Sequence, residues 1–206
     1  MSELLTMPDF MVELPNQGLP DPAELTYYKL EKERKIYLDY EVDENSLNIQ
    51  KMILRWNMED KDIPIEQRKP IWIYILSPGG ALTYMWAICD AINASKTPVY
   101  TVNAGLAASA ASLIFISGHK RFMFKTSTVL IHEGSAELSG DAIKVMDQSE
   151  AYKKSLKQMK EYILEKTKIP PKDLNKKRAN DWELSSDYCI KNGVCDVLVE
   201  TLDDII

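Results

Sequence analysis

The sequence is poor in the residues that build metal centres and disulfide frameworks. Its 206 residues include only three cysteines and two histidines. Cys89, Cys189 and Cys195 are odd in number and none of their spacings is the CxxC of a zinc site, so we expect reduced, structural thiols. No acidic cluster has the spacing of a calcium loop. We therefore predict neither a metal nor a cofactor.

Long apolar runs and basic clusters are also missing. No hydrophobic stretch approaches the ~20 residues that span a bilayer. The first residues, "MSELLTMPDFMVELPNQGLP", lack the basic lead-in and continuous apolar core of a secretion signal. The formal net charge is -6, and no basic cluster is of the kind that follows a phosphate backbone. These absences favour a cytoplasmic protein that binds neither membranes nor nucleic acid.

The residues that are present fit one globular domain of ordinary size. The chain is 45% hydrophobic and 27% charged, and its length allows a single substantial core over residues 1–206. Residues 1–24 contain proline and methionine without a clear period, which predicts an N-terminal arm or loop.

Strand patterns and helix patterns alternate through the rest of the chain, separated by short turns. In order, we predict a strand at 35–42, a helix at 44–60, a strand at 71–76, the turn "SPGG", a helix at 81–96, a strand at 98–105, a helix at 106–118, and strands at 121–126 and 127–133. A long helix with one apolar stripe follows at 139–169. A last helix and strand lie within 183–199, and this helix has Ser185 or Ser186 as its N-cap and ends at Gly193. Such alternation indicates βαβ crossovers. The predicted fold class is α/β with a mostly parallel sheet buried on both faces.

Ser109 lies in the small, apolar stretch "NAGLAASAASLIF". In an α/β sheet, ligands gather where strands end and helices begin, and glycine turns mark two such points here, at 79–80 and at 105. A hydroxyl beside a helix start can attack a carbonyl while backbone N–H groups hold the developing oxyanion. The alternative is a tightly packed helix in which Ser109 bonds to a carbonyl one turn back.

A serine nucleophile needs a base, which is nearly always histidine. His119 lies in the polar turn "SGHKR", where we expect a solvated ring. His132 ends the apolar strand "VLIH", where a polar ring at the rim of a sheet has either a structural hydrogen bond or a catalytic role. The 31 acidic residues offer many candidates for a third member, and periodicity does not choose among them.

Four motifs in order, "YILSPGG", "GLAASAAS", "VLIHEG" and "ANDWELSSDYCIKNGVCDVLV", resemble the proteolytic subunits of the Clp protease (ClpP) family. The resemblance extends from about residue 29 to residue 199. It implies a ClpP/crotonase-type fold of repeated βαβ units with a protruding handle helix at about 140–167. It also implies a serine endopeptidase with Ser109 as nucleophile, His132 as base and Asp181 as the third member of the triad.

The resemblance further implies the binding groups and the partners. The backbone N–H groups of Gly80 and Ala110 would form the oxyanion hole. A peptide would lie as an added strand, with Gly79, Leu82 and Ser135 among its contacts. The family's members form homo-oligomeric rings, two of them stacked around a chamber, and a separate Clp-type ATPase feeds unfolded protein into it.

Two departures from the family pattern concern specificity and ring stacking. "EGSAELSGDA", with Glu133 and Glu137, follows the histidine where Gln-Pro and a glycine-rich strand are common. Ala110 stands where the family usually has methionine.

Two other functions stay open: a crotonase-type enzyme acting on coenzyme A thioesters, and a non-catalytic ring subunit.

Overall fold

The computed structural model describes residues 22–134, 137–177 and 180–206. The chain divides into two compact units, residues 1–33 and residues 34–206. In the first unit the described element is helix α1 (Pro22–Lys32), so residues 22–24 of the predicted arm begin a helix and the rest of that arm lies outside the described residues. The second unit contains the sheet and all three residues of the predicted triad.

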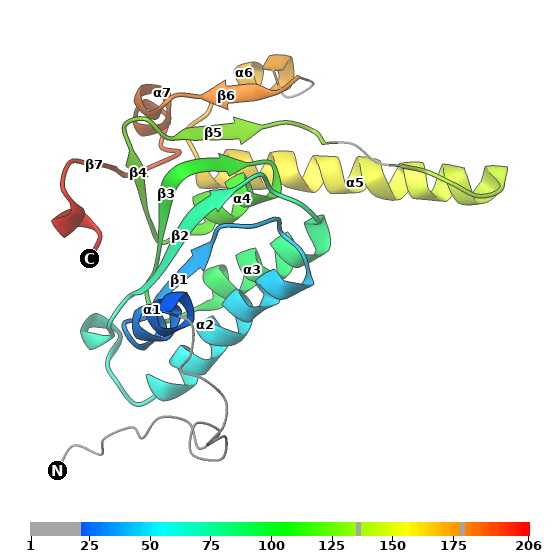
Figure 1. Cartoon of the computed structure of the whole chain (residues 1–206). Helices are drawn as coiled ribbons and strands as arrows, with labels where there is room; N and C mark the ends of the chain where they lie inside the picture. Colours follow the sequence, from blue (N-terminus) through cyan, green and yellow to red (C-terminus); the bar gives the residue numbers. More distant parts are fainter. Residues whose placement is uncertain (1–21, 135–136, 178–179) are drawn as a thin grey trace, which may run out of the picture. The chain divides into compact units, whose positions relative to one another are not determined.

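The second unit is built on a seven-stranded sheet (Figure 1). Its strands are β1 (Lys35–Leu38), β2 (Ile71–Ser77), β3 (Val99–Ala108), β4 (Lys120–Phe124), β5 (Thr128–Ile131), β6 (Trp182–Leu184) and β7 (Val197–Val199). The order is β1-β2-β3-β4-β7, with β5 paired to β3 and β6 paired to β5. Among these described strands, β6 alone runs antiparallel to its neighbour. The predicted α/β class with a mostly parallel sheet is confirmed.

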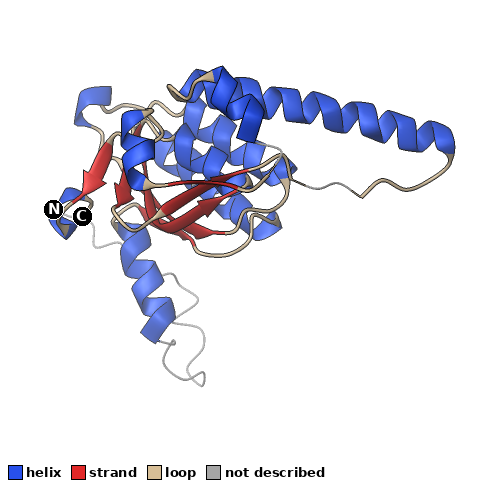
Figure 2. Cartoon of the chain, turned by 90° about the horizontal axis from the view of Figure 1, so that it is seen from above, coloured by secondary structure: helices blue, strands red, loops and turns tan. Residues whose placement is uncertain are grey.

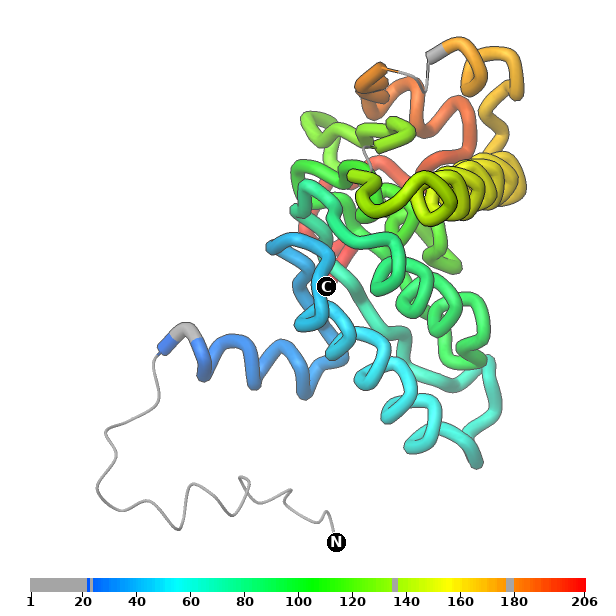
Figure 3. The backbone as a smooth tube through the Cα atoms, turned by 90° about the vertical axis from the view of Figure 1, so that its right-hand side faces the viewer, coloured from blue at the N-terminus to red at the C-terminus, as the bar shows by residue number. Residues whose placement is uncertain are grey.

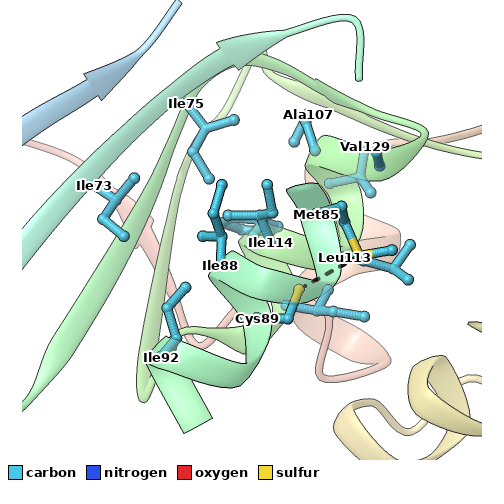
Figure 4. Close-up of a cluster of buried hydrophobic side chains, with 14 of the residues drawn as sticks. Ile73, Ile75, Met85, Ile88, Cys89, Ile92, Ala107, Leu113, Ile114 and Val129 are labelled. Atoms are coloured by element: carbon cyan, nitrogen blue, oxygen red, sulfur yellow. Dashed lines mark hydrogen bonds between the residues drawn. The ribbon is translucent and has the colours of Figure 1, made fainter. Parts of the chain in front are cut away.

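Helices α2 (Leu47–Glu59), α3 (Leu82–Ala94) and α4 (Ala110–Ser117) share one hydrophobic core with the sheet. Helices α2 and α3 lie side by side (Figure 3). In the core, Met85, Ile88 and Ile92 of α3 belong to the same buried cluster as Ile73 and Ile75 of β2 (Figure 4). Burying these side chains on one face of the helix holds α3 against the sheet.

A second apolar cluster covers the other face of the sheet. It contains Trp72, Tyr74, Phe122 and the C-terminal Ile205. The rings of Trp72 and Phe122 pack at a tilt of 44°, with their centroids 5.2 Å apart. The hydroxyl of Tyr74 donates a hydrogen bond to the carbonyl oxygen of Ile205. Because this cluster lies opposite the helices, the central strands are buried on both faces, which explains their continuous apolar sequence.

Strand β3 is longer than predicted and changes partner along its length. Residues 100–103 pair with β4, and residues 106–108 pair with β5. The predicted helix at 106–118 is therefore wrong in its first residues, because Leu106–Ala108 continue the strand and α4 begins only at Ala110. Gly105 lies where the partner changes, with φ at 159°, and a side chain there would meet Leu76.

The long predicted helix is α5 (Ala142–Lys166), which begins at the N-cap Asp141. Its C-terminal half is anchored in the core through Met159 and Ile163. Its N-terminal half extends away from the sheet (Figure 2) and exposes Ile143 and Met146. The handle that the resemblance implies is thus present.

Two short elements near the C-terminus have no counterpart in the sequence-based prediction. Helix α6 (Pro171–Lys177) and strand β6 separate α5 from α7 (Ser186–Lys191). Helix α7 begins as predicted, because the side chain of Ser185 accepts a hydrogen bond from the N–H of Tyr188. In the part of the chain that is described, no helix is long and apolar enough to cross a membrane.

Candidate active site

Strand register brings the three predicted triad residues to one end of three neighbouring strands. In the parallel β3–β5 pair, Ala108 lies opposite Leu130, so Ser109 follows β3 at the level where β5 ends. In the antiparallel β5–β6 pair, Ile131 lies opposite Trp182, so the residue after β5 faces the residue before β6. Those two residues are His132 and Asp181.

Ser109 occupies a sharp turn between strand and helix. Its φ and ψ are 52° and -124°, a backbone conformation that non-glycine residues rarely adopt. Its N–H donates to the carbonyl oxygen of Leu130 at 2.9 Å, which fixes the turn against β5. The side chain is only half-buried, and no hydrogen bond from it to a carbonyl one turn back is present among the described residues. The strained turn, rather than a helix interior, holds this hydroxyl.

The glycine turn after β2 lies directly against Ser109. A Cβ atom on Gly79 would lie 2.6 Å from the carbonyl oxygen of Ala108, 2.7 Å from the Cβ of Ser109 and 2.9 Å from the nitrogen of Ala110. Because backbone atoms cannot give way at such distances, residue 79 has to be glycine. The absence of a side chain at Gly79 lets the turn after β2 lie in direct contact with the turn that holds Ser109.

Hydrogen bonds around the turn distinguish Gly80 from its neighbours. Val42 donates to the carbonyl oxygen of Gly79 at 2.7 Å and accepts from the N–H of Ala81 at 2.8 Å. The N–H of Gly79 donates to the hydroxyl of Ser77 at 3.2 Å. Within the described chain these bonds leave the N–H of Gly80 unused.

A second N–H group is available at the start of α4. Ala110 is the first residue of this helix, and the first N–H groups of a helix have no intrahelical acceptor. The helix dipole adds a partial positive charge at the same place. The two predicted oxyanion donors, Gly80 and Ala110, therefore lie on the two turns that meet beside Ser109.

The ring of His132 is oriented by Asp181. Its Nδ1 lies 3.1 Å from Oδ1 of the carboxylate, and 30% of the histidine side chain and 72% of the aspartate side chain are exposed. A carboxylate facing Nδ1 favours the tautomer with its proton on Nδ1, so that Nε2 carries the lone pair.

The Nε2 atom of His132 is buried and has no hydrogen-bond partner among the described residues. Leaving a buried acceptor unpaired costs about 1–3 kcal/mol. Such a cost is typical of a functional site, where a ligand or a reacting group supplies the missing partner. No Ser109–His132 hydrogen bond is formed among the described residues; in unliganded enzymes such bonds are often long and tighten only when substrate binds.

The other histidine has a structural role. Nδ1 of His119 accepts a hydrogen bond from the N–H of Val99 at 3.1 Å, and the backbone N–H of His119 donates to the carbonyl oxygen of Val99 at 2.8 Å. Although much of the residue is exposed, burial of part of the ring lowers the pKa of His119 below its ordinary value. The expectation of a merely solvated ring is therefore incomplete.

Sequence reasoning missed Asn103, a fully buried amide in the middle of β3. Its Nδ2 donates to the carbonyl oxygen of Thr128 at 2.9 Å, and its Oδ1 accepts from the N–H of Gly105 at 3.1 Å. Asn103 thus ties the strand that leads to Ser109 to the strand that leads to His132. The signal available in the sequence was a polar residue inside an otherwise apolar strand pattern.

The remaining predicted contacts are only partly described. Leu82 is the half-buried first residue of α3, two residues after Gly80. Ser135 lies outside the described residues. Across the part of the chain that is described, no group of three histidine, cysteine or carboxylate side chains is arranged to hold a metal ion.

The chain is similar to known proteins of one family. A model of the family described as "Clp protease" matches residues 21–201. A protein of Frankia casuarinae named "ATP-dependent Clp protease proteolytic subunit 2" is 30% identical over 178 residues, which cover 85% of this chain and 79% of the relative. A protein of Treponema denticola with the same name is 34% identical over 139 residues, covering 66% of this chain and 70% of the relative.

Proposed function

Because the chain belongs to the Clp protease family and is a serine-type peptidase by that membership, we propose that it hydrolyses peptide bonds with Ser109, His132 and Asp181. The observation that carries the proposal is the His132–Asp181 pair, with Nδ1 and Oδ1 3.1 Å apart. This pair lies at the end of the strand to which the turn of Ser109 is hydrogen-bonded.

The proposed chemistry assigns each group one task. Nε2 of His132, which has no other partner among the described residues, accepts the proton of the Ser109 hydroxyl as the oxygen attacks the substrate carbonyl. The N–H groups of Gly80 and Ala110 then hold the oxyanion. Asp181 keeps the ring in the required tautomer and stabilises the imidazolium that forms. The protonated ring returns its proton to the leaving amine as the C–N bond breaks, which leaves the acyl group on Ser109. A water molecule, deprotonated by the same Nε2, then attacks this ester, and the carboxylic acid leaves as the serine hydroxyl takes the proton back.

The substrate would bind as an extended strand. The proposed contacts are Gly79, Leu82 and Ser135, on either side of the nucleophile along the chain. An added strand is held chiefly by main-chain hydrogen bonds, so that many sequences can enter, while side-chain pockets set the preference.

We also propose that identical subunits form rings, two of them stacked, around a chamber, and that a separate Clp-type ATPase delivers unfolded protein to it. The relatives' name, which contains "ATP-dependent" and "proteolytic subunit", supports this part. The exposed Ile143 and Met146 on the projecting half of α5 are available for contact with another subunit. A cytoplasmic location belongs to the same proposal and is supported by the three free, buried cysteines.

The test of the proposed function compares a short peptide with a folded protein. The purified assembly should cleave a fluorogenic dipeptide without ATP, because a short peptide is already extended. It should leave a stably folded protein intact unless a Clp-type ATPase and ATP are added, because the backbone of a folded domain is paired internally. Digestion of the folded protein without ATP, at a rate comparable to that of the peptide, would contradict the chamber.

Asp181 provides a second test. We expect Asp181→Asn to lower kcat by roughly 10² to 10⁴, because the amide has no charge to stabilise the imidazolium and favours the wrong tautomer. The lower part of that range reflects the exposure of 72% of this side chain, which lets water replace part of its effect.

The matched controls for Asp181 are Asp173→Asn and Asp187→Asn. Both aspartates lie in the first turns of neighbouring helices, α6 and α7, and neither forms an ion pair with His132. Both variants should retain most of their activity on the fluorogenic peptide. If one of them were inactive while Asp181→Asn worked normally, the third member of the triad would be wrongly assigned.

The thioester alternative is less well supported by the site. An enzyme of the crotonase type would use the glycine turn and the helix start, but it would leave the His132–Asp181 pair without a task. The non-catalytic alternative likewise leaves the orphaned Nε2 of His132 unexplained.

A further inference from the structure

Strand β3 exchanges one neighbour for another across two residues, and Asn103 lies where the exchange begins. Asn103 is the last residue of β3 that pairs with β4, opposite Met123. Pairing with β5 begins where Leu106 lies opposite Thr128. Because β2 occupies the other edge of β3 along both stretches, β4 and β5 follow one another on the same edge. We call the stretch from Asn103 to Leu106, together with the start of β5, the fork of the sheet.

Three hydrogen bonds close this fork, and two of them come from the side chain of Asn103, which is fully buried. Its Nδ2 donates to the carbonyl oxygen of Thr128 at 2.9 Å, and its Oδ1 accepts from the N–H of Gly105 at 3.1 Å. The hydroxyl of Ser127 donates to the backbone carbonyl oxygen of Asn103 at 3.0 Å. A side-chain amide has a donor and an acceptor, as a peptide group has. The amide of Asn103 therefore serves as an extra peptide group between the two strands where backbone pairing is interrupted.

The two strands that leave the fork carry the proposed nucleophile and base. The β3–β5 ladder is only three residue pairs long, and it includes Ala107 and Ala108, whose small side chains do little to fix its register. Beyond the ladder, the N–H of Ser109 donates to the carbonyl oxygen of Leu130, two residues before His132. A displacement of β5 at the fork is therefore passed on to the distance between Ser109 and His132.

We propose that Asn103 is a positioning residue for the triad, because its amide fixes β5 against β3 and so sets the distance over which His132 takes the proton of Ser109. Proton transfer needs the two heavy atoms about 3 Å apart, and a misplacement of about 1 Å can cost roughly a hundredfold in rate. Without the amide, the buried carbonyl oxygen of Thr128 loses a donor and gains from moving toward another one. The inference rests on the proposed peptidase function and assigns a further residue to that same site.

The experiment compares Asn103→Ala with Thr101→Ala at a temperature at which circular dichroism shows both variants to be folded. Thr101 is the matched control, because it is equally buried on β3 and also donates to a backbone carbonyl oxygen, that of Phe115 in α4, at 2.7 Å. Both variants should lose melting temperature. Only Asn103→Ala should lower kcat for a fluorogenic peptide, by about a hundredfold.

Two readouts separate positioning from stability. KM should change by less than about twofold in Asn103→Ala, because the proposed peptide contacts Gly79 and Leu82 lie on the turn and helix that follow β2, away from the fork. The rate at which a fluorophosphonate labels Ser109 should fall together with kcat, because this reaction needs the same activated hydroxyl. Thr101→Ala should keep the wild-type kcat and the wild-type labelling rate.

Ser127→Ala removes the third hydrogen bond of the fork and leaves the amide of Asn103 in place. It should lower kcat by a smaller factor, about threefold to tenfold, with KM unchanged. A wild-type kcat in folded Asn103→Ala, or an equal loss in Thr101→Ala, would overturn the inference. If Asn103→Ala does not fold, Ser127→Ala decides: a loss of kcat alone supports the inference, and an unchanged kcat overturns it. In all these cases the wild type cleaves the peptide and the proposed function stands, whereas an inactive wild type would contradict both.

Discussion

Replacing Ser109 by alanine should abolish peptide cleavage and leave the fold intact. The strained turn presents the Ser109 hydroxyl where β3 ends and is hydrogen-bonded to β5, the strand that leads to His132, and alanine removes the proposed attacking oxygen without adding volume. In a serine protease where the nucleophile has been removed, kcat fell about 10⁶-fold. We expect a loss of similar order, measured with a fluorogenic peptide, together with an unchanged melting temperature.

Ser117→Ala is the matched control for Ser109→Ala. Ser117 ends the same helix α4, and its hydroxyl bonds to the carbonyl oxygen of Leu113 and to Tyr162, so its loss affects only local stability. This variant should keep its activity and should still react with a fluorophosphonate probe, which Ser109→Ala should not. Normal turnover by Ser109→Ala would remove the central claim and favour a thioester enzyme or a non-catalytic subunit.

The main layout of the fold could be predicted because local patterns and tertiary structure agree. The apolar run at 71–76, the glycine turn and the helical spacing of apolar residues in 81–96 each indicate the element that forms. The end of β3 could not be predicted in this way. Leu106–Ala108 are small and apolar, which fits a helix as well as a strand, and pairing with Thr128–Leu130 of β5 decides between them.

The carboxylate of the candidate triad was equally hidden from pattern analysis. Asp181 precedes β6, a strand of three residues that is too short to give a periodic signal. Antiparallel pairing of this strand with β5 is what places Asp181 opposite His132. Asp181 was identified only through the resemblance to the family. Its contact with His132 depends on how β5 and β6 pair in the folded protein, which no short stretch of the sequence indicates.

His132 and His119 differ in the hydrogen-bond partners of their ring nitrogens, so we expect opposite effects when each is replaced by alanine. His132→Ala should lose nearly all peptidase activity, because no other described group stands ready to accept the proton of Ser109. The loss should approach that of Ser109→Ala, since members of a triad act as a unit, and combining the two substitutions should add little. Measuring kcat for the single variants and the double variant tests this dependence directly.

His119→Ala should instead cost stability and little activity. The variant loses the acceptor for the N–H of Val99, worth about 1 kcal/mol, at a position that the proposed chemistry does not use. The lowered pKa of His119 means that the unfolded chain takes up a proton more readily than the folded one, so this contribution is complete above the ordinary imidazole pKa and is lost as the pH falls below it. The wild type should therefore lose melting temperature as the pH is lowered through that range, and His119→Ala should lose less of it. An inactive His119→Ala protein beside an active His132→Ala protein would reverse the two roles, and with them the assignment of the base.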